Sequence, residues 1–307
     1  MKTLLAIFAH PDDESFGIGG TLAKYAREGA AVHYLCGTRG ESGTVDPEFL
    51  QGYADISELR STELECASRE LGLSGVHYLG YRDSGMPGSP DNRHPNSLFS
   101  ASVDDVAGRI IRFLDSLHPD VVITHDKFGG YGHPDHIKLY HATVRAYEQR
   151  YGVSLVDPPP TFGASRQAST PMPPTAGQPS PDAPKDATPT PRLYVTAFPK
   201  GLLKFGVKVL PLLRQNPRKF GRNKDIDLVE MSTWVVPVTA TVAVSAYAGY
   251  KERASACHVS QRPVSTQGNL VARLLFRRAN QAESFSRIYP PVTGSEPAES
   301  DLFGVKR

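Results

Sequence analysis

Cysteine is scarce in this sequence of 307 residues. The three cysteines, Cys36, Cys66 and Cys257, are odd in number, lie far apart and form no CxxC pair. Small secreted domains that depend on disulfides carry many more cysteines at close spacing. The sequence therefore predicts no disulfide framework, which fits a protein of a reducing compartment.

Long apolar runs and a strong net charge are also missing. No stretch approaches the roughly 20 apolar residues that a membrane-spanning helix requires. The apolar run before His10 is shorter than the core of a secretory signal. The net charge of +2 is too small to indicate nucleic acid or a membrane surface as the main partner. We expect a cytoplasmic protein with no membrane span and no nucleic-acid partner.

The sequence does contain enough apolar residues for a core, 39% beside 21% charged residues. Short β-rich runs alternate with amphipathic helical patterns, which indicates βαβ units and an α/β fold with a mostly parallel sheet. Since the C-terminal strands are too few for a core of their own, we expect them to complete the same sheet. The expected strands are 4–9, 31–36, 76–79, 121–124, 193–197, 234–244 and 284–289, and the expected helices are 17–28, 56–71, 103–117, 134–150 and 245–258.

The composition changes sharply after the first half of the chain. Residues 157–192 consist mainly of Pro, Ala, Thr, Ser and Asp, with almost no large apolar side chains. Such a segment cannot bury enough surface to offset the entropy lost on ordering. We expect a disordered insert or a mobile flap within a single domain that spans residues 1–307.

A basic stretch, residues 200–224, places lysine and arginine among Leu, Phe and Val. One interpretation is a surface for anionic lipid or for an acidic substrate. The other is a solvated helix face beside the insert. We favour the solvated face, because nothing else in the sequence points to a membrane.

Two polar clusters directly follow expected buried strands. The first is AHPDDE at 9–14, and the second is GGYGHPDH at 129–136. The carboxyl ends of neighbouring parallel strands open into the crevice where ligands bind in α/β sheets. A single HPD turn is more often structural than catalytic, but two His/Asp clusters at strand ends favour a shared site.

The clusters contain the ligands that a catalytic zinc needs, three protein side chains and one position left for water. His10 and Asp13 would come from one tight loop, and His136 from the first turn of the following helix. Pro134 suits the first position of that helix, because the N–H that proline lacks would be unpaired there. The sequence therefore predicts a zinc site of His10, Asp13 and His136.

Amide hydrolysis also needs a base and donors to the oxyanion. Asp12, adjacent to the expected ligand Asp13, is the natural base. His133, if protonated, would donate to the oxyanion, with Asp135 orienting the imidazole. Tyr131 is close enough in sequence to add a second donor.

The paired motifs AHPDDE and YGHPDH resemble the PIG-L/LmbE family of zinc-dependent de-N-acetylases, and the resemblance covers nearly the whole chain apart from the insert. It includes Gly40-Glu41, Arg60, the YRDSGM segment at 81–86, and Lys251 through the HVSQ segment at 258–261. It implies a Rossmann-like three-layer fold, and one zinc at His10, Asp13 and His136, which Fe(II) could replace. It also implies Asp12 as base and His133 with Asp135 behind it.

Similar family members include the deacetylases of bacillithiol and mycothiol synthesis, whose substrates are N-acetylglucosamine (GlcNAc) linked to malate or inositol. By analogy, Asp83 would contact sugar hydroxyls and Arg60 the aglycone side, although a turn cap and a solvated helix residue are equally good interpretations. Glu41 is a weaker candidate for substrate contact. His258 would line the pocket, but a lone histidine is more often simply hydrogen-bonded in place.

Three other functions compete with this interpretation. The glycines at 17, 19 and 20 do not match GxGxxG, which disfavours a dinucleotide site. A metal phosphoesterase would use adjacent carboxylates and histidines to hold two ions. A catalytically silent sugar-binding protein would need no base such as Asp12. A homo-oligomer is compatible with the sequence, as is a small amino-sugar conjugate as substrate.

Overall fold

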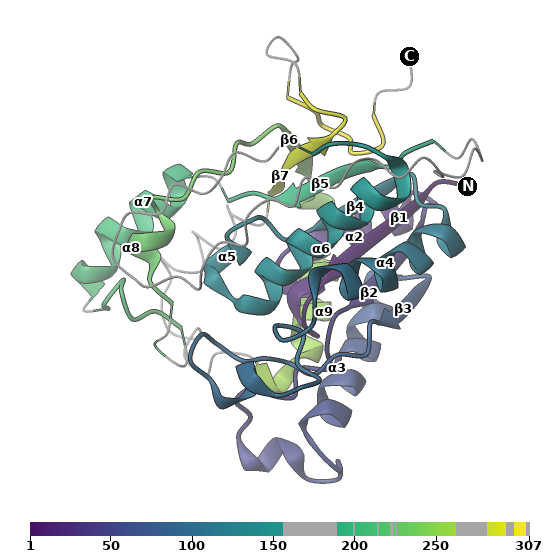
Figure 1. Cartoon of the computed structure of the whole chain (residues 1–307). Coiled ribbons are helices and arrows are strands. Elements are labelled where there is room, and N and C mark those ends of the chain that lie inside the picture. Colours follow the sequence, from purple (N-terminus) through teal and green to yellow (C-terminus); the bar gives the residue numbers. More distant parts are fainter. Residues whose placement is uncertain are drawn as a thin grey trace.

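Seven strands form one sheet in the order β3-β2-β1-β4-β5-β7-β6 (Figure 1). The computed structural model describes residues 1–155, 189–198, 200–213, 215–221, 224, 226–261, 281–292 and 298–304. The strands from β3 to β5 are parallel, and β7 runs antiparallel to both β5 and β6. The expected α/β fold is confirmed, with C-terminal strands completing the sheet. The strands are β1 (Thr3–Phe8), β2 (Ala31–Cys36), β3 (Gly75–Tyr78), β4 (Val121–Thr124), β5 (Arg192–Thr196), β6 (Ala240–Ala243) and β7 (Ala282–Tyr289).

Helices cover both faces of the sheet. Side chains alternate along β1, so that Leu4, Ala6 and Phe8 pack on one face and Leu5 and Ile7 on the other. The first face is covered by α2 (Gly19–Arg27), α3 (Ile56–Leu71) and α9 (Ala248–Cys257). The second is covered by α4 (Val103–Leu117) and α6 (Pro134–Tyr151). Burial on both faces explains why β1 reads as a continuous apolar run.

Local sequence signals set where the long helices begin and end. The Ser102 side chain accepts a hydrogen bond from the N–H of Asp105 at the start of α4. Gly72 follows α3 with φ 77°, a left-handed conformation that glycine adopts without steric cost. The remaining elements are α1 (Asp13–Phe16), α5 (Gly129–Gly132), α7 (Lys200–Val209), α8 (Leu228–Met231), and the short 3-10 turns η1 (Pro47–Leu50), η2 (Pro90–Arg93), η3 (Leu210–Leu213), η4 (Ser245–Tyr247) and η5 (Val259–Gln261).

The second half differs from expectation in several places. Of the strand expected at 234–244, only the part that forms β6 is a strand. Pro237, which has no N–H to donate within a sheet, lies in the part without regular structure. The helix expected at 245–258 begins as the 3-10 turn η4. Of the insert expected at 157–192, residues 157–188 lie outside the described residues, and Arg192 already belongs to β5.

A disulfide joins Cys66 on α3 to Cys257 at the end of α9, which corrects the expectation of none. The two cysteines are separated by 191 residues in sequence, and they meet because α3 and α9 pack against each other. Cys36 is the free, buried cysteine. Cysteine spacing could not reveal this pair, because its proximity depends on tertiary packing.

None of the helices in the described part of the chain combines the length and the apolar character that crossing a bilayer would require.

Candidate metal centre

The two polar clusters meet at the carboxyl ends of neighbouring strands. β1 pairs with β4, and the loop after β1 carries His10 and Asp13, while α6 begins beyond the loop after β4. The Nδ1 atom of His10 lies 3.1 Å from Nε2 of His136. The Oδ2 atom of Asp13 lies 3.7 Å from the former and 3.5 Å from the latter. Residues more than a hundred positions apart therefore form one compact group.

These three atoms fit a metal ion. Ligand atoms about 2.0–2.1 Å from a tetrahedral zinc are roughly 3.3–3.4 Å from one another, and the observed separations are 3.1, 3.5 and 3.7 Å. Three groups of His and carboxylate side chains with this potential overlap here, made of His10, Asp13, Asp83, His125, His133, Asp135 and His136. The cluster can hold a metal ion.

The second ring nitrogen of His10 faces two carboxylates. Its Nε2 lies 3.4 Å from Oδ1 of Asp83 and 3.4 Å from Oδ2 of Asp135. Burial lowers the pKa of His10, but the attraction of Asp83 and its neighbours outweighs burial and leaves the pKa well above 6.5. A carboxylate on the far nitrogen is the usual way in which proteins fix the orientation of a metal-binding imidazole.

Asp12 has an unusual backbone. Its φ of 120° is rare for a residue other than glycine, a conformation that costs on the order of 1–3 kcal/mol. Its Oδ2 accepts a hydrogen bond of 2.8 Å from Nη2 of Arg60. Burial raises the pKa of Asp12 to about 6, although Arg60 opposes the shift. A carboxylate with a pKa near neutrality suits proton transfer.

Arg60 lies inside the protein rather than on a substrate surface. It is 3% exposed, and its guanidinium also donates to the carbonyls of Pro11 and Gly40. A Cβ at Gly40 would clash with the guanidinium of Arg60, so only glycine leaves room for this group. Arg60 therefore holds the loop that carries Asp12, and the structure does not bring it to a surface where an aglycone could bind.

His258 is also buried, with no exposed surface. Its Nε2 lies 2.6 Å from Oε1 of Glu14, and Oε2 of Glu14 accepts the N–H of Asp12 at 2.9 Å. Burial and the attraction of Glu14 oppose each other, and the pKa of His258 rises above 6.5. Instead of lining a pocket, His258 supports the backbone of Asp12 through Glu14.

One stripe of α3 ties the C-terminal segment to this loop. Glu63 accepts hydrogen bonds of 2.8 Å from both the N–H and the hydroxyl of Ser260. Arg60, Glu63 and Cys66 are three residues apart and share a helix face. From this face Arg60 reaches the Asp12 loop, while the other two hold the chain on both sides of His258.

His133 caps α6. Its Nδ1 accepts the N–H of Asp135 at 3.2 Å, so the neutral ring carries its proton on Nε2. Burial, followed by repulsion from His10 and His136, lowers the pKa of His133 well below 6.5. The protonated His133 that the sequence suggested is therefore disfavoured, and Nε2–H is the donor that this ring offers.

The carboxylate of Asp135 does not contact His133 as expected. It accepts from the N–H of Ser84 at 2.9 Å and from the hydroxyl of the same serine, besides facing His10. The contact between Asp135 and His133 is made by the N–H of Asp135, which the imidazole caps. The Tyr131 ring lies 6.0 Å from that of His133 and 5.3 Å from that of His136.

His125 is a residue that the sequence interpretation missed. It directly follows β4, is 5% exposed, and stacks on His136 with ring centroids 3.7 Å apart. Its Nε2 lies 3.6 Å from Oδ2 of Asp13 but accepts the N–H of Ala9 at 3.1 Å. Because the Nε2 lone pair of His125 accepts this hydrogen bond, it is not available to a metal ion. His125 instead stacks on His136 and orients that ring. Its place at a buried strand end was the available signal.

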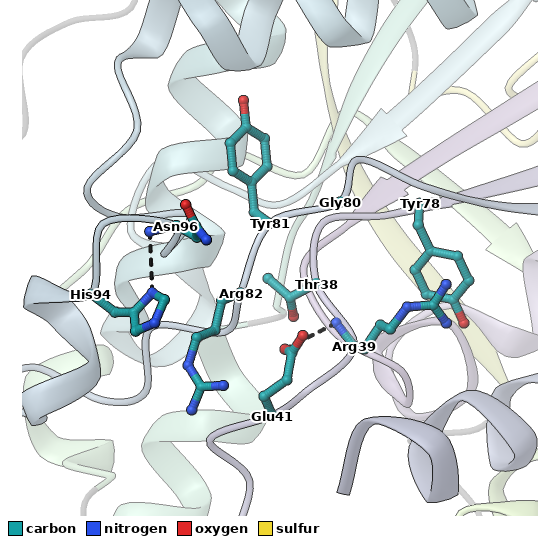
Figure 2. A pocket seen from close by; sticks show the side chains of 9 residues that line it. All are labelled: Thr38, Arg39, Glu41, Tyr78, Gly80, Tyr81, Arg82, His94 and Asn96. Carbon is teal, nitrogen blue, oxygen red and sulfur yellow. Dashed lines mark hydrogen bonds between the residues drawn. The ribbon is translucent and has the colours of Figure 1, made fainter. Parts of the chain in front are cut away.

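A polar pocket of about 330 Å³ lies at the neighbouring strand ends (Figure 2). Glu41 lines it, and its Oε2 accepts the N–H groups of Arg39 and Asp83 at 3.2 and 2.9 Å. Asp83 is 3% exposed, and its Oδ1 lies 3.4 Å from Nε2 of His10, so this residue connects Glu41 of the pocket with the cluster. The other lining residues are Thr38, Tyr78, Gly80, Tyr81, Arg82, His94 and Asn96.

Known proteins share both the sequence and the fold. Residues 5–147 match the model of the PIG-L family, described as GlcNAc-PI de-N-acetylase. A protein of Thermobifida fusca named 1D-myo-inositol 2-acetamido-2-deoxy-alpha-D-glucopyranoside deacetylase is 32% identical over 98% of this chain and 99% of its own.

Solved structures agree in fold at lower identity. The N,N'-diacetylchitobiose deacetylase of Pyrococcus horikoshii is 19% identical, with a TM-score of 0.55 over 93% of this chain and 83% of its own. The 4-carboxy-2-hydroxymuconate hydratase of Pseudomonas putida is 17% identical, with a TM-score of 0.53 over 96% and 100%. Because a protein named as a deacetylase and one named as a hydratase share this fold, the fold alone does not determine the reaction. The sequence relationship across the whole length does decide the family: the chain belongs to the PIG-L family.

Proposed function

We propose that this protein hydrolyses the acetamide of a GlcNAc-containing conjugate and releases acetate and the free amino sugar. One zinc ion, held by His10, Asp13 and His136, would serve the reaction, with Fe(II) as the alternative ion. The observation that carries the proposal is the set of three ligand atoms within 3.1–3.7 Å of one another, beside a buried carboxylate at Asp12. A bound zinc supplies a water activated at neutral pH and a Lewis acid for the acetamide carbonyl.

Asp12 is the proposed general base. Its carboxylate stands next to the ligand Asp13, and Arg60 fixes one oxygen at 2.8 Å. Its pKa of about 6 means that it is ionised at neutral pH, yet basic enough to accept a proton from the attacking water. The same carboxyl group then returns the proton to the leaving amine.

His133 and Tyr131 are the proposed donors to the oxyanion. Nδ1 of His133 is occupied by the cap of α6, which leaves Nε2–H to donate. Burial raises the pKa of Tyr131 well above 10, so its phenol keeps the proton that it would donate. Two neutral donors can stabilise the developing negative charge without the cost of burying another cation. Asp135 acts at one remove, by orienting His10.

Glu41 is the residue that we propose for contact with the sugar. It lies in the pocket of Figure 2, where Asn96 and Thr38 offer further hydrogen-bonding groups. Asp83, which contacts both Glu41 and His10, would meet the hydroxyls nearest the acetamide. We assign Arg60 and His258 to positioning, because their side chains hold Asp12 and Glu14.

Among the conjugates considered, GlcNAc-inositol is the first to test. The Thermobifida fusca relative, which matches along its entire length, is named for an inositol glycoside of N-acetylglucosamine. The comparisons do not support a bacillithiol assignment. Cytoplasmic location and a homo-oligomeric state remain predictions, and the disulfide makes the redox state of the purified protein worth measuring.

The test is release of free amine from GlcNAc-inositol, GlcNAc-malate and N,N'-diacetylchitobiose, with and without a chelator. We expect turnover of at least one conjugate, its loss on chelation, and its return with zinc or Fe(II). Absence of amine release from all three by the metal-loaded protein would contradict the proposal. A metal phosphoesterase would instead hold two ions per chain about 3.5–4 Å apart and cleave a phosphate monoester.

A further inference from the structure

Exposed apolar side chains are concentrated in one segment of the chain, which includes α7 and α8. α7 and α8 lie beside α5, away from the sheet (Figure 1), and α8 packs against both α7 and α5. Of the eleven large apolar side chains that the described residues expose, six lie between residues 198 and 238. They are Phe198, Phe205, Leu212, Phe220, Val235 and Val238. A soluble surface normally scatters such side chains singly, so this concentration indicates contact with another phase or molecule.

Positive charge gathers in the same segment. Residues 200–224 contain eight lysines and arginines and no aspartate or glutamate. The whole chain has a net charge of +2, so the remainder is net negative. The first acidic side chain described beyond this segment, Asp227, already pairs with Arg218 at 3.0 Å.

The two properties share one face of α7. Lys204, Phe205 and Lys208 are exposed, and at about 100° per residue they lie within one 100° arc of the helix. Leu212 follows one turn later in η3 and is 80% exposed. A solvated helix face, which the sequence alone favoured, explains the lysines but not an exposed Phe205 and Leu212.

We propose that this face of α7 and η3 docks on an anionic lipid bilayer. A helix that lies in the bilayer interface inserts Phe and Leu between lipid chains, while its lysines meet the headgroup phosphates. Anionic lipid attracts such a polybasic segment, and an apolar protein groove alone would not select for eight positive charges. The surface thus fits a partner that offers negative charge and an apolar phase together.

Docking would bring the segment next to the candidate centre onto the bilayer. The Trp234 ring stacks on Phe128 with centroids 5.2 Å apart, and Phe128 begins the loop that leads to His133. The inference concerns association alone, so it does not depend on the reaction proposed above.

The test is co-sedimentation of the full chain with vesicles of phosphatidylcholine alone and of equal parts phosphatidylcholine and phosphatidylglycerol. We expect binding to the anionic vesicles, weakened by salt, and little to the neutral ones. K204Q/K208Q should weaken binding on the order of 30-fold, and F205S/L212S on the order of 100-fold. R69Q/R112Q, which removes two exposed arginines of α3 and α4, should bind as the wild type does.

Equal binding to neutral vesicles, no binding to either kind, or equal losses in R69Q/R112Q and K204Q/K208Q would overturn the proposal. A second copy of this chain as the true occupant would instead give a dimer that F205S/L212S dissociates and that vesicles do not disturb. Both variants of the docking face should keep the wild-type thermal midpoint and metal content, because the exchanged side chains are exposed. This check separates lost docking from lost folding.

Discussion

Nε2 of His258 lies 2.6 Å from Oε1 of Glu14, and neither side chain has exposed surface. The second oxygen of Glu14 holds the N–H of Asp12, whose φ is 120°. A strained conformation persists only where its surroundings determine it. The buried pair of Glu14 and His258 fixes the backbone of Asp12, and Arg60 fixes its carboxylate. Together they hold the proposed base in this conformation.

The first prediction concerns this positioning role. His258→Gln removes the cationic partner of the buried Glu14 carboxylate, so the free energy of unfolding should fall by about 3 kcal/mol. Because Asp12 is then held less well, kcat should fall on the order of 10- to 100-fold with little change in KM. Urea unfolding and steady-state kinetics measure the two effects. The exposed His141→Gln serves as a stability control, and an unchanged kcat in His258→Gln would argue against positioning.

The second prediction concerns pH. Burial lowers the pKa of His258, but the attraction of Glu14 and its neighbours raises it by more, so the pKa lies above 6.5. The stabilisation from this raised pKa is fully present below pH 6.5 and is lost as pH rises through the folded-state value. The difference in free energy of unfolding between the wild type and His258→Gln should therefore shrink at alkaline pH. Urea titrations in chelator across that range measure it, and a difference that grows with pH would contradict the sign.

The third prediction concerns the metal. His136→Ala removes one of three proposed ligands, so the purified protein should retain little zinc. Elemental analysis after gel filtration gives the zinc content per chain. His141→Ala is the matched control, because it changes the same residue type on the same helix at an exposed position. An unchanged zinc content in His136→Ala would reject the assignment of this ligand.

The fourth prediction separates the base from the ligands. Asp12→Asn preserves shape and the contact with Arg60 but removes the proton acceptor. We expect the variant to bind one zinc and to lose about 10²- to 10⁴-fold in kcat. Amine release and metal content, measured on the same preparation, decide the matter. Near-normal turnover would place the base elsewhere.

The fold could be predicted wherever local signals and burial agree. The stripe from Ile56 to Leu71 ends at Gly72, as expected, because a left-handed residue stops a helix. Buried strands such as Val121–Thr124 read as apolar runs. The region before β6 could not be placed, because its apolar residues resemble a strand although Pro237 interrupts the ladder.

The part of the site that lies at neighbouring strand ends could be predicted from the sequence. The sequence places His10, Asp13 and His136 at neighbouring strand ends, and the structure brings them together. The contacts that depend on tertiary packing could not be predicted from the sequence. The sequence interpretation did not single out His125, and the pairings of His258 with Glu14 and of Cys66 with Cys257 join residues nearly two hundred positions or more apart.

The contact between Glu14 and His258 has a consequence for synthesis of the protein. All three proposed ligands lie within residues 5–147, which match the family model. A nascent chain that ends before residue 258 would hold those ligands but leave Glu14 without its histidine partner. Competence therefore arises only when the last part of the chain emerges, and we expect ribosome-bound fragments to be inert.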